Sequence, residues 1–225
     1  MATQARTSAP RRARPRAEAE EAPDRRRNIL AAAERLFARH GYHGVSIRDI
    51  AEEAGVPLAL VGYYYGPKLE LYEEIFRQRS GYIKERLAAL ETLWQGPREE
   101  LLERIVRAFV RPALKLAADP EGRQFMQLVA RNLVEQGPEN SGPRAELFDP
   151  VAHAYIDAFM KALPGISRAQ AAWCYQFSLG ALMHHISDQR IEDLSHGEAK
   201  ARQFDRSAEL LCRFLAAGIR SACNV

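Results

Sequence analysis

Residues 46–68 of this chain read SIRDIAEEAGVPLALVGYYYGPK. Ser46 can cap a short helix, and Asp49 stands three residues later in the acidic position of a capping box. Gly55 follows where a helix must end with a positive φ, which glycine adopts without steric cost. Pro57 suits the first turn of a second helix, because the amide hydrogen that proline lacks would have no partner there. The stretch therefore predicts a helix-turn-helix.

An amphipathic helix precedes this motif. Apolar residues recur at spacings of three and four from Ile29 to Phe37, which is typical of a helix with one buried face. Asp24 or a near neighbour is expected to cap the helix, and Gly41 to end it just after Arg39. Three short helices around Phe37 would then form a small N-terminal domain.

The first 23 residues form a segment rich in arginine, alanine and proline. Such a composition cannot bury enough apolar surface to order itself, so residues 1–23 are expected to be a disordered basic arm. Beside a helix-turn-helix, the arm could neutralise phosphates or reach into a minor groove. The alternative is that it only keeps the chain soluble.

Several segments at fixed spacing resemble the DNA-binding domain of the tetracycline-repressor (TetR) family. The match covers about residues 25–75 and is carried by ILAAAERLF at 29–37, HGY at 40–42, RDIAEEAGV at 48–56, Tyr63 and Lys68. The resemblance implies a helix-turn-helix domain over residues 24–69, with the motif at about 47–66. It also implies a larger helical domain for effector binding and dimerisation over residues 70–225.

The resemblance further implies a transcriptional regulator, a dimeric repressor that binds a pseudo-palindromic operator in double-stranded DNA. A small, apolar effector would release it from the operator. The competing hypothesis is a ligand-binding or adaptor protein of the same fold whose N-terminal domain does not read DNA specifically.

The expected DNA contacts lie on the two short helices of the motif. Tyrosine hydroxyls and a lysine at a helix start suit phosphate oxygens, and the apolar residues that open the second helix suit the thymine methyl group. The expected contacts are Ser46, Arg48, Pro57, Leu58, Ala59, Tyr63, Tyr64 and Lys68. Arg48 could instead be a solvated charge, and Tyr64 could belong to the core together with Tyr65.

The motif departs from the family pattern in two respects. The usual tyrosine-histidine-phenylalanine triplet is Tyr63-Tyr64-Tyr65 here, and Pro57 replaces the serine or threonine that opens the recognition helix. Proline has no side-chain donor for a phosphate. Operator choice would then depend on methyl contacts, backbone geometry and the arginine arm.

The rest of the chain reads as helices without strand-like alternation, which predicts an all-α protein. The predicted segments are 69 to about 94, 99–118, 121–136, 144–163, 168–186 and 199–222. The last two are apolar over much of their circumference and need partners on more than one side. We therefore expect a homodimer in which these two helices of each subunit form a four-helix contact.

Aromatic and methionine positions of the larger domain are candidates for an apolar effector pocket. The candidates are Trp94, Phe109, Phe125, Met126, Tyr155, Phe159, Trp173 and Phe177, with Arg131 as a polar candidate beside them. The alternative for each apolar residue is a place in the ordinary core.

Composition excludes several other classes. The net charge is only +3, and no apolar run approaches the roughly 18 residues that cross a bilayer, so a cytoplasmic protein without a membrane partner is expected. The three cysteines lack C-x-x-C spacing, with Cys223 a candidate exposed thiol, and His184 with Asp188 offers too few ligands for a metal. No catalytic motif is present, so neither an enzyme nor a cofactor is expected.

Overall fold

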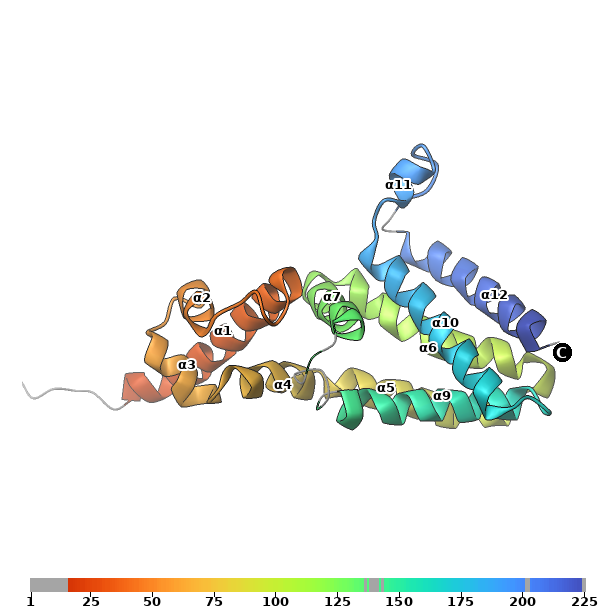
Figure 1. The fold of residues 1–225 in the computed structure, drawn as a ribbon, viewed down its shortest axis with the longest axis horizontal. Coiled ribbons are helices and arrows are strands. Elements are labelled where there is room, and N and C mark those ends of the chain that lie inside the picture. Colours follow the sequence, from red (N-terminus) through yellow and green to blue (C-terminus); the bar gives the residue numbers. More distant parts are fainter. Residues whose placement is uncertain (1–15, 136, 138–141, 143, 201–202, 224–225) are drawn as a thin grey trace, which may run out of the picture.

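The computed structural model describes residues 16–135, 137, 142, 144–200 and 203–223 (Figure 1). Every regular element within these ranges is a helix, so the predicted all-α class is confirmed. A smaller N-terminal group of helices, here called the head, joins a larger C-terminal group, the body. Among the described helices, none is both long enough and apolar enough to cross a membrane.

The head consists of α1 (Arg16–His40), α2 (Ile47–Glu53), α3 (Leu58–Tyr65) and α4 (Lys68–Gln78). Its core contains Phe37, Ile50, Val61 and Tyr72, each at most 1% exposed. The rings of Phe37 and Tyr72 meet edge to face with their centres 5.1 Å apart. This core fixes α2 and α3 against α1, as the apolar spacing of the sequence predicts.

Helix α1 begins earlier than the sequence predicts. It starts at Arg16 and includes Pro23, whereas the sequence places a disordered arm up to residue 23. Residues 16–22 read RAEAEEA, and alanine and glutamate are strong helix formers. Their propensity outweighs the loss of one backbone hydrogen bond at Pro23. The other part of the predicted arm, residues 1–15, lies outside the described residues.

The helix expected from 69 to about 94 is divided at Arg79. Helix α4 ends at Gln78, Arg79 has φ −86° and ψ 5°, and α5 runs over Ser80–Glu91. The Arg79 guanidinium lies 3.0 Å and 3.3 Å from the two carboxylate oxygens of Glu34 in α1, and 5.7 Å from the centre of the Phe125 ring. These contacts hold the joint between head and body.

The body continues with short 3₁₀ turns and then longer helices. Its elements are η1 (Thr92–Gln95), η2 (Arg98–Glu100), α6 (Leu101–Ala118), α7 (Pro120–Val134), a π-helical turn η4 (Arg144–Phe148), α9 (Asp149–Ala162), α10 (Arg168–Ser187), α11 (Ile191–Leu194) and α12 (Phe204–Cys223). Helix α12 packs mainly against α6, while α10 packs against α7 and α9. Pro112 lies inside α6, which continues past it.

The ends of the last helices show which sequence signals decide them. Ser167 forms a capping box with Gln170 at the start of α10, as expected for a serine in that place. The final helix begins at Phe204 rather than at 199, and the chain turns earlier at His196 and Gly197, with φ 51° and 87°. The short α11 has no counterpart in the sequence prediction.

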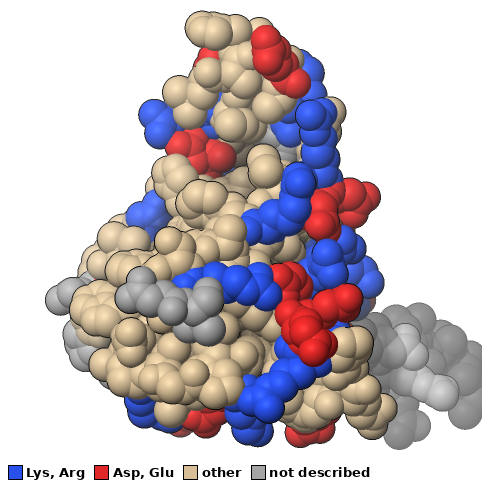
Figure 2. Space-filling model, turned by 90° about the vertical axis from the view of Figure 1, so that its right-hand side faces the viewer, with Lys and Arg blue, Asp and Glu red and all other residues tan. Residues whose placement is uncertain are grey.

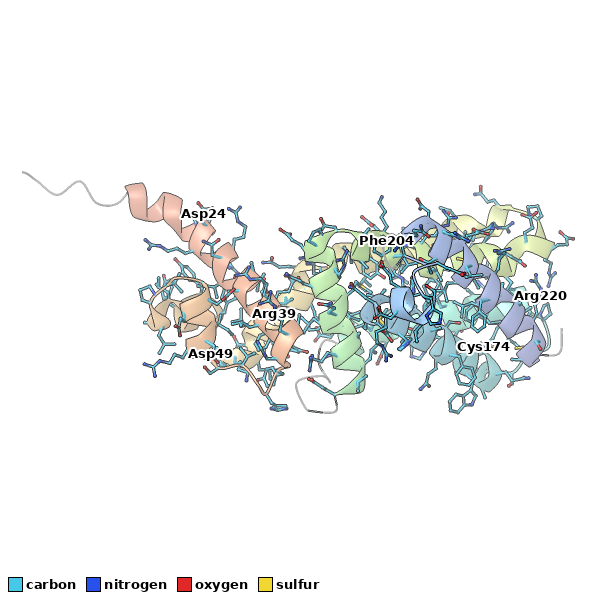
Figure 3. The ribbon with its side chains drawn as sticks, turned by 90° about the horizontal axis from the view of Figure 1, so that it is seen from above. Asp24, Arg39, Asp49, Cys174, Phe204 and Arg220 are labelled. Atoms are coloured by element: carbon cyan, nitrogen blue, oxygen red, sulfur yellow. The ribbon has the colours of Figure 1, made fainter. Side chains whose placement is uncertain are left out.

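Helix α7 of the body crosses the C-terminal end of α1 near Arg39 (Figure 3). The Arg131 guanidinium donates to the Arg39 carbonyl at 3.1 Å and to the Glu135 carboxylate at 3.1 Å. Next to it, the buried Asn132 amide donates to the Tyr72 hydroxyl of α4 at 3.2 Å. Two polar contacts from α7 therefore fasten the head to the body.

All three cysteines are buried, so the expectation of an exposed Cys223 is wrong. Its sulfur lies 3.7 Å from that of Cys174, where α12 ends beside α10. Burial, the neighbouring thiol and its charge raise the pKa of Cys174 to about 11. Both side chains thus serve as small apolar groups in the core.

Candidate nucleic-acid interface

The start of α2 is fixed by a capping box. The Asp49 amide donates to the Ser46 hydroxyl at 3.2 Å, and the Ser46 amide donates to the Asp49 carboxylate at 2.8 Å. These hydrogen bonds hold the pKa of Asp49 below its usual range. The sequence prediction of this cap is confirmed. Because the Ser46 hydroxyl also donates to Asp49, its contacts are already used within the protein.

The turn between α2 and α3 depends on Gly55. Its φ is +64°, a left-handed conformation that costs other residues energy. The Gly55 amide donates to the Glu52 carbonyl at 3.1 Å, and the Val56 amide donates to the Ala51 carbonyl at 3.0 Å. These bonds close α2 and aim the chain into α3. Pro57 occupies the N-cap of α3, one position before its first turn.

Helix α3 has a buried side and an exposed side. Val61 and Tyr65 point into the head, as the position of Tyr65 in the sequence suggested. On the other side, Tyr63 is 80% exposed and Leu58 is 52% exposed. Pro57 and Ala59 are exposed as well, and so is Arg48 on the neighbouring α2. These expected DNA contacts are all exposed, and Leu58, Ala59 and Tyr63 lie on the exposed side of α3.

Tyr64 and Lys68 are less exposed than the other expected contacts. The half-buried Tyr64 packs edge to face against Tyr63, with ring centres 5.2 Å apart. Lys68 opens α4, and its ammonium nitrogen lies 4.1 Å from the centre of the Tyr42 ring. A cation over an aromatic face keeps its charge while its stem packs, so Lys68 presents a positive charge near α3.

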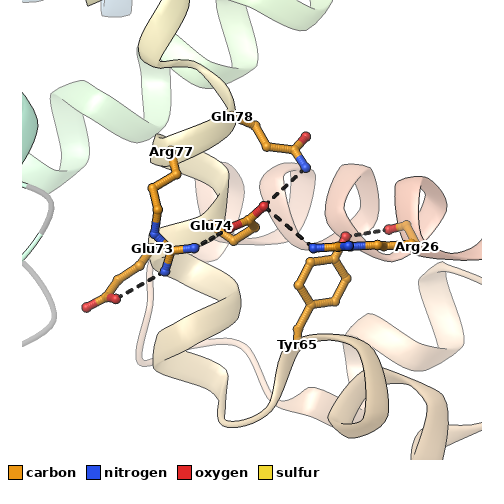
Figure 4. Close-up of polar contacts among 6 residues, drawn as sticks. All are labelled: Arg26, Tyr65, Glu73, Glu74, Arg77 and Gln78. Atoms are coloured by element: carbon orange, nitrogen blue, oxygen red, sulfur yellow. Dashed lines mark hydrogen bonds and ion pairs between the residues drawn. The ribbon is translucent and has the colours of Figure 1, made fainter. Parts of the chain in front are cut away.

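The buried side of α3 is anchored to α1 and α4 (Figure 4). The Tyr65 hydroxyl donates to the Arg26 carbonyl at 2.7 Å, while the Arg26 guanidinium lies 3.9 Å from the Glu74 carboxylate. Glu74 also pairs with Arg77, and it accepts from Gln78 at 3.4 Å. Helix α3 is therefore held on a frame made by its two neighbours.

Comparison with known families gives two matches along the chain. Residues 29–75 match the model described as bacterial regulatory proteins of the tetR family, and residues 107–218 match a tetracyclin repressor-like C-terminal domain. The chain belongs to the TetR family. The first match covers the helix-turn-helix and α4, and the second covers most of the body.

Curated transcriptional regulators are similar over part of the chain. The HTH-type transcriptional regulator BetI of Agrobacterium fabrum is 38% identical over 79 residues, which are 35% of this chain and 38% of BetI. The HTH-type transcriptional repressor AcnR of Corynebacterium efficiens is 25% identical over 146 residues, 60% of this chain and 77% of AcnR. The chain thus spans little more than a third of the length of BetI.

A solved structure shares the TetR fold over nearly the whole chain. FadR from Bacillus subtilis, in complex with stearoyl-CoA, superposes with a TM-score of 0.60 at 15% identity. The similarity covers 85% of this chain and 98% of FadR. At this identity the likeness establishes the fold and leaves the ligand of this chain open.

The body of this TetR-family chain does not gather the expected effector residues around one cavity. Five of them are at most 1% exposed and belong to the continuous core: Phe109, Phe125, Met126, Tyr155 and Phe159. Trp173 and Phe177 instead point outward from α10, with their rings stacked 5.7 Å apart. Trp94 is 41% exposed beneath the Lys161 ammonium, and Arg131 lies at the junction with the head.

Two open grooves border the body core. One, of about 1310 Å³, is lined by residues of α4, α5, α6 and α12, among them Tyr82 and Leu114. The other, of about 1010 Å³, is lined by residues of α1, α7, α9 and α10, and it includes Arg131 and Tyr175. A ligand entering either groove would contact helices that adjoin the head.

The sequence prediction missed two buried charged residues of this TetR-family chain, Glu34 and Arg86. They are 7% and 4% exposed. Arg86 stands three residues after Ile83 and four before Leu90, so it occupies the apolar face of its helix. That spacing is the signal that could have identified it. A charge on an apolar face is buried only at a cost, which makes it a candidate for function.

Proposed function

We propose that this chain is a transcriptional repressor that inserts α3 into the major groove of DNA. The observation that carries the proposal is the exposed face of α3 on a capped helix-turn-helix. Three apolar positions, Pro57, Leu58 and Ala59, precede Tyr63 on that face. Although its ring meets that of Tyr64, the Tyr63 side chain remains 80% exposed. The head match and the names of the similar regulators support this reading.

The chemistry of this face favours certain contacts. Leu58 and Ala59 can pack against thymine methyl groups, while the Tyr63 hydroxyl can donate to a phosphate oxygen. Arg48 on α2 and Lys68 on α4 flank α3 and add positive charge that attracts the DNA backbone. Ser46 contributes through the cap that fixes α2, and Tyr64 through its packing against Tyr63.

We also propose that two copies pair through α10 and α12. These helices leave four large apolar side chains between 58% and 68% exposed: Trp173, Phe177, Leu210 and Phe214. Seen from the end of the body, uncharged residues cover a broad surface and charged ones gather toward one side (Figure 2). Several large apolar side chains exposed on two neighbouring helices are typical of a protein interface. A two-fold pair would present two α3 helices to a pseudo-palindromic operator.

Release by a small effector completes the proposal. The groove lined by Tyr82 borders α4 and α5, so a ligand there can change the angle at Arg79. A ligand that binds more tightly when the two heads are wrongly spaced for the operator weakens operator binding. The operator weakens ligand binding by the same coupling free energy. The alternative, an adaptor without specific DNA binding, is favoured by the departure at Pro57.

Fluorescence anisotropy with DNA from upstream of the chain's own gene, at two salt concentrations, tests the repressor against the adaptor. A repressor should show steep salt dependence together with at least about 1000-fold preference over random DNA. Absence of binding at low salt would exclude DNA recognition. Equal binding to all sequences would favour the adaptor.

Replacing Lys68 with alanine is expected to weaken binding to all sequences equally. The slope of log Kd against log salt concentration should decrease by about 1, as expected for the loss of one phosphate contact. The matched control is Lys84→Ala, which removes an exposed cation from α5 in the body. If Lys68→Ala lowers the melting temperature but leaves the salt dependence unchanged, the lysine serves only to pack on Tyr42.

Replacing Gly62 with alanine is expected to stabilise the free protein but to weaken its complex with DNA. A Cβ at this exposed position of α3 would meet no atom within 4 Å, so the gain should be about 0.5–1 kcal/mol. On DNA the same methyl group would stand between α3 and the groove. Gly81→Ala in α5 is the control, because its Cβ also meets open space. Urea unfolding and anisotropy measure the two effects, and tighter DNA binding by Gly62→Ala would contradict the docking of this face.

A further inference from the structure

Arg86 is a buried cation without a carboxylate partner among the described residues. It lies in α5, 4% exposed, and among the described residues its guanidinium donates to the Phe109 carbonyl at a long 3.5 Å and interacts with the Tyr82 and Tyr155 side chains. The Nε atom has no hydrogen-bond partner within the part of the chain that the structure describes. No carboxylate of the described residues lies within ion-pair distance. The charge is therefore enclosed but not neutralised.

Aromatic rings surround this guanidinium. Its central carbon lies 4.7 Å from the ring centre of Phe109, 5.1 Å from that of Tyr155 and 5.5 Å from that of Tyr82. Cation–π contacts return only about 0.5–2 kcal/mol each, whereas an unpaired buried charge costs several kcal/mol. The rings reduce the cost of burying Arg86 without balancing its charge.

The tyrosines cannot act as counter-ions. Burial raises the pKa of Tyr82, Tyr155 and Tyr175 above the ordinary tyrosine value, so their hydroxyls stay protonated at neutral pH. Arginine itself cannot lose its proton in a protein. The cluster consequently carries a full positive charge that only an added anion can neutralise.

A second donor is unsatisfied at the same place. The Tyr82 hydroxyl is buried and has no hydrogen-bond partner among the described residues. Tyr82 stands four residues before Arg86, so the two side chains share one face of α5. The Tyr155 hydroxyl, by contrast, already donates to the Ala108 carbonyl at 2.9 Å. The Arg86 Nε atom and the Tyr82 hydroxyl, one charged donor and one neutral donor, thus lie on the same helix face without an acceptor among the described residues.

Tyr82 also lines the groove of about 1310 Å³, whose walls include Pro112, Leu114 and Ala208. These residues provide apolar surface next to the charged cluster. The neighbouring groove of about 1010 Å³ includes Tyr175, which borders the cluster from α10. Arg86 is not among the residues that line either groove, and Tyr82 connects the larger groove to the cluster. A molecule with an apolar part in that groove would have to pass its anionic end beside the Tyr82 ring to reach the donors.

We propose that the body binds a small organic carboxylate whose carboxylate pairs with Arg86 and accepts from the Tyr82 hydroxyl. A carboxylate offers two acceptor oxygens in one plane, which matches the planar fork of a guanidinium. The apolar part of the ligand occupies the groove lined by Tyr82 and Leu114. The statement that this ligand is the effector rests on the proposed function. The binding site itself does not depend on that function.

The position of the site gives it access to the DNA-binding head. Arg86 stands seven residues after Arg79, where α5 meets α4, and α4 belongs to the head. Pairing with a ligand would pull the Arg86 side chain and its helix relative to α6, which supplies the Phe109 carbonyl. Displacement of α5 would then be passed to the joint at Arg79.

Thermal unfolding of the full chain with hexanoate, octanoate, decanoate and benzoate, each compared with its neutral amide, tests the proposal. The best carboxylate is expected to raise the Tm by about 5–10 °C at a hundredfold excess over its Kd. The matching amide, which lacks the charge, should bind at least about tenfold more weakly by calorimetry. Equal effects of acid and amide, or no shift with any of the acids, would overturn the proposal.

The informative variant is Arg86→Met, which replaces the charge with an apolar side chain of similar length. Its Tm without ligand is expected to equal or exceed that of the wild type, since apolar replacement of a buried charge is often neutral or stabilising. Its response to the carboxylate should disappear. Lys84→Met, an exposed cation on the same helix, should keep the full response. A carboxylate shift retained in Arg86→Met contradicts the site.

The variant Tyr82→Phe provides a second test of the site, which does not depend on whether Arg86→Met folds. It removes only the hydroxyl, so the melting temperature should hold while the carboxylate Kd rises about fivefold to tenfold. An unchanged Kd excludes the second contact. DNA binding by the unliganded wild type is measured in parallel. A wild-type protein that binds its operator but shows no response to any carboxylate refutes this site alone, and one that responds to a carboxylate through Arg86 but does not bind DNA refutes the repressor alone.

Discussion

Replacing Phe177 and Phe214 together with aspartate is expected to make the protein a monomer and to weaken operator binding at least about 100-fold. The two side chains are 64% and 68% exposed on α10 and α12, so aspartate there should leave the fold of each subunit intact. A charge in the middle of an apolar interface must be desolvated without a partner, which opposes pairing. A single subunit then reaches only one half-site, and the second contact is lost.

Size-exclusion chromatography with light scattering measures the subunit mass, and anisotropy measures the affinity. The control is Leu194→Asp, which alters a side chain that is 69% exposed on α11, outside the proposed interface. This variant should remain a dimer and bind normally. A dimeric Phe177→Asp/Phe214→Asp protein would place the subunit contact elsewhere. A monomeric variant with full affinity would show that pairing does not contribute to operator binding.

Replacing Arg79 with methionine is expected to lower the free energy of unfolding by about 3 kcal/mol. The substitution leaves the Glu34 carboxylate, only 10% exposed in its side chain, without its cation. Burial already raises the pKa of Glu34 against the attraction of Arg79. Without Arg79 the pKa rises further, and a raised folded-state pKa means that stability is lost as pH rises through it. The loss should therefore be larger at pH 8 than at pH 5.

Urea unfolding at several pH values tests this expectation. Arg77→Met is the matched control, because Arg77 stands on the same helix and forms exposed ion pairs with Glu73 and Glu74. Its removal should cost less than about 1 kcal/mol. The double variant Glu34→Met/Arg79→Met should recover most of the stability, since both charges are removed. Failure to recover would show that Arg79 acts through its contact with Phe125.

The parts of the fold that the sequence predicted depend on local signals. The cap at Ser46 and the turn at Gly55 are decided within a few residues, so the head could be assigned from the sequence. The break at Arg79 could not, because arginine favours helix and the contacts that divide α4 from α5 come from α1 and α7. The start of α1 was misjudged because Pro23 stands inside a strong helix former.

The candidate site shows a similar division. Apolar spacing identifies buried residues, but it does not separate core from subunit contact. Phe109 and Phe177 look alike in sequence, yet one is enclosed and the other is exposed. Arg86 broke the apolar pattern of its helix, and only the structure shows that no carboxylate of the described residues reaches it. The DNA contacts from Ser46 to Lys68 stay a prediction, although most of these residues are exposed.

The contacts between α7 and the head limit how the domains of such regulators can be exchanged. Arg131 and Asn132 lie in the body, yet they bond to the Arg39 carbonyl and the Tyr72 hydroxyl of the head. A chimera that exchanges only residues before Lys68 would divide α4 from its neighbours and place a foreign α1 against α7. In such a chimera the head should respond to the ligand only if the α7 residues that contact it are transferred as well. A head transferred without them should keep its operator preference but lose the ligand response.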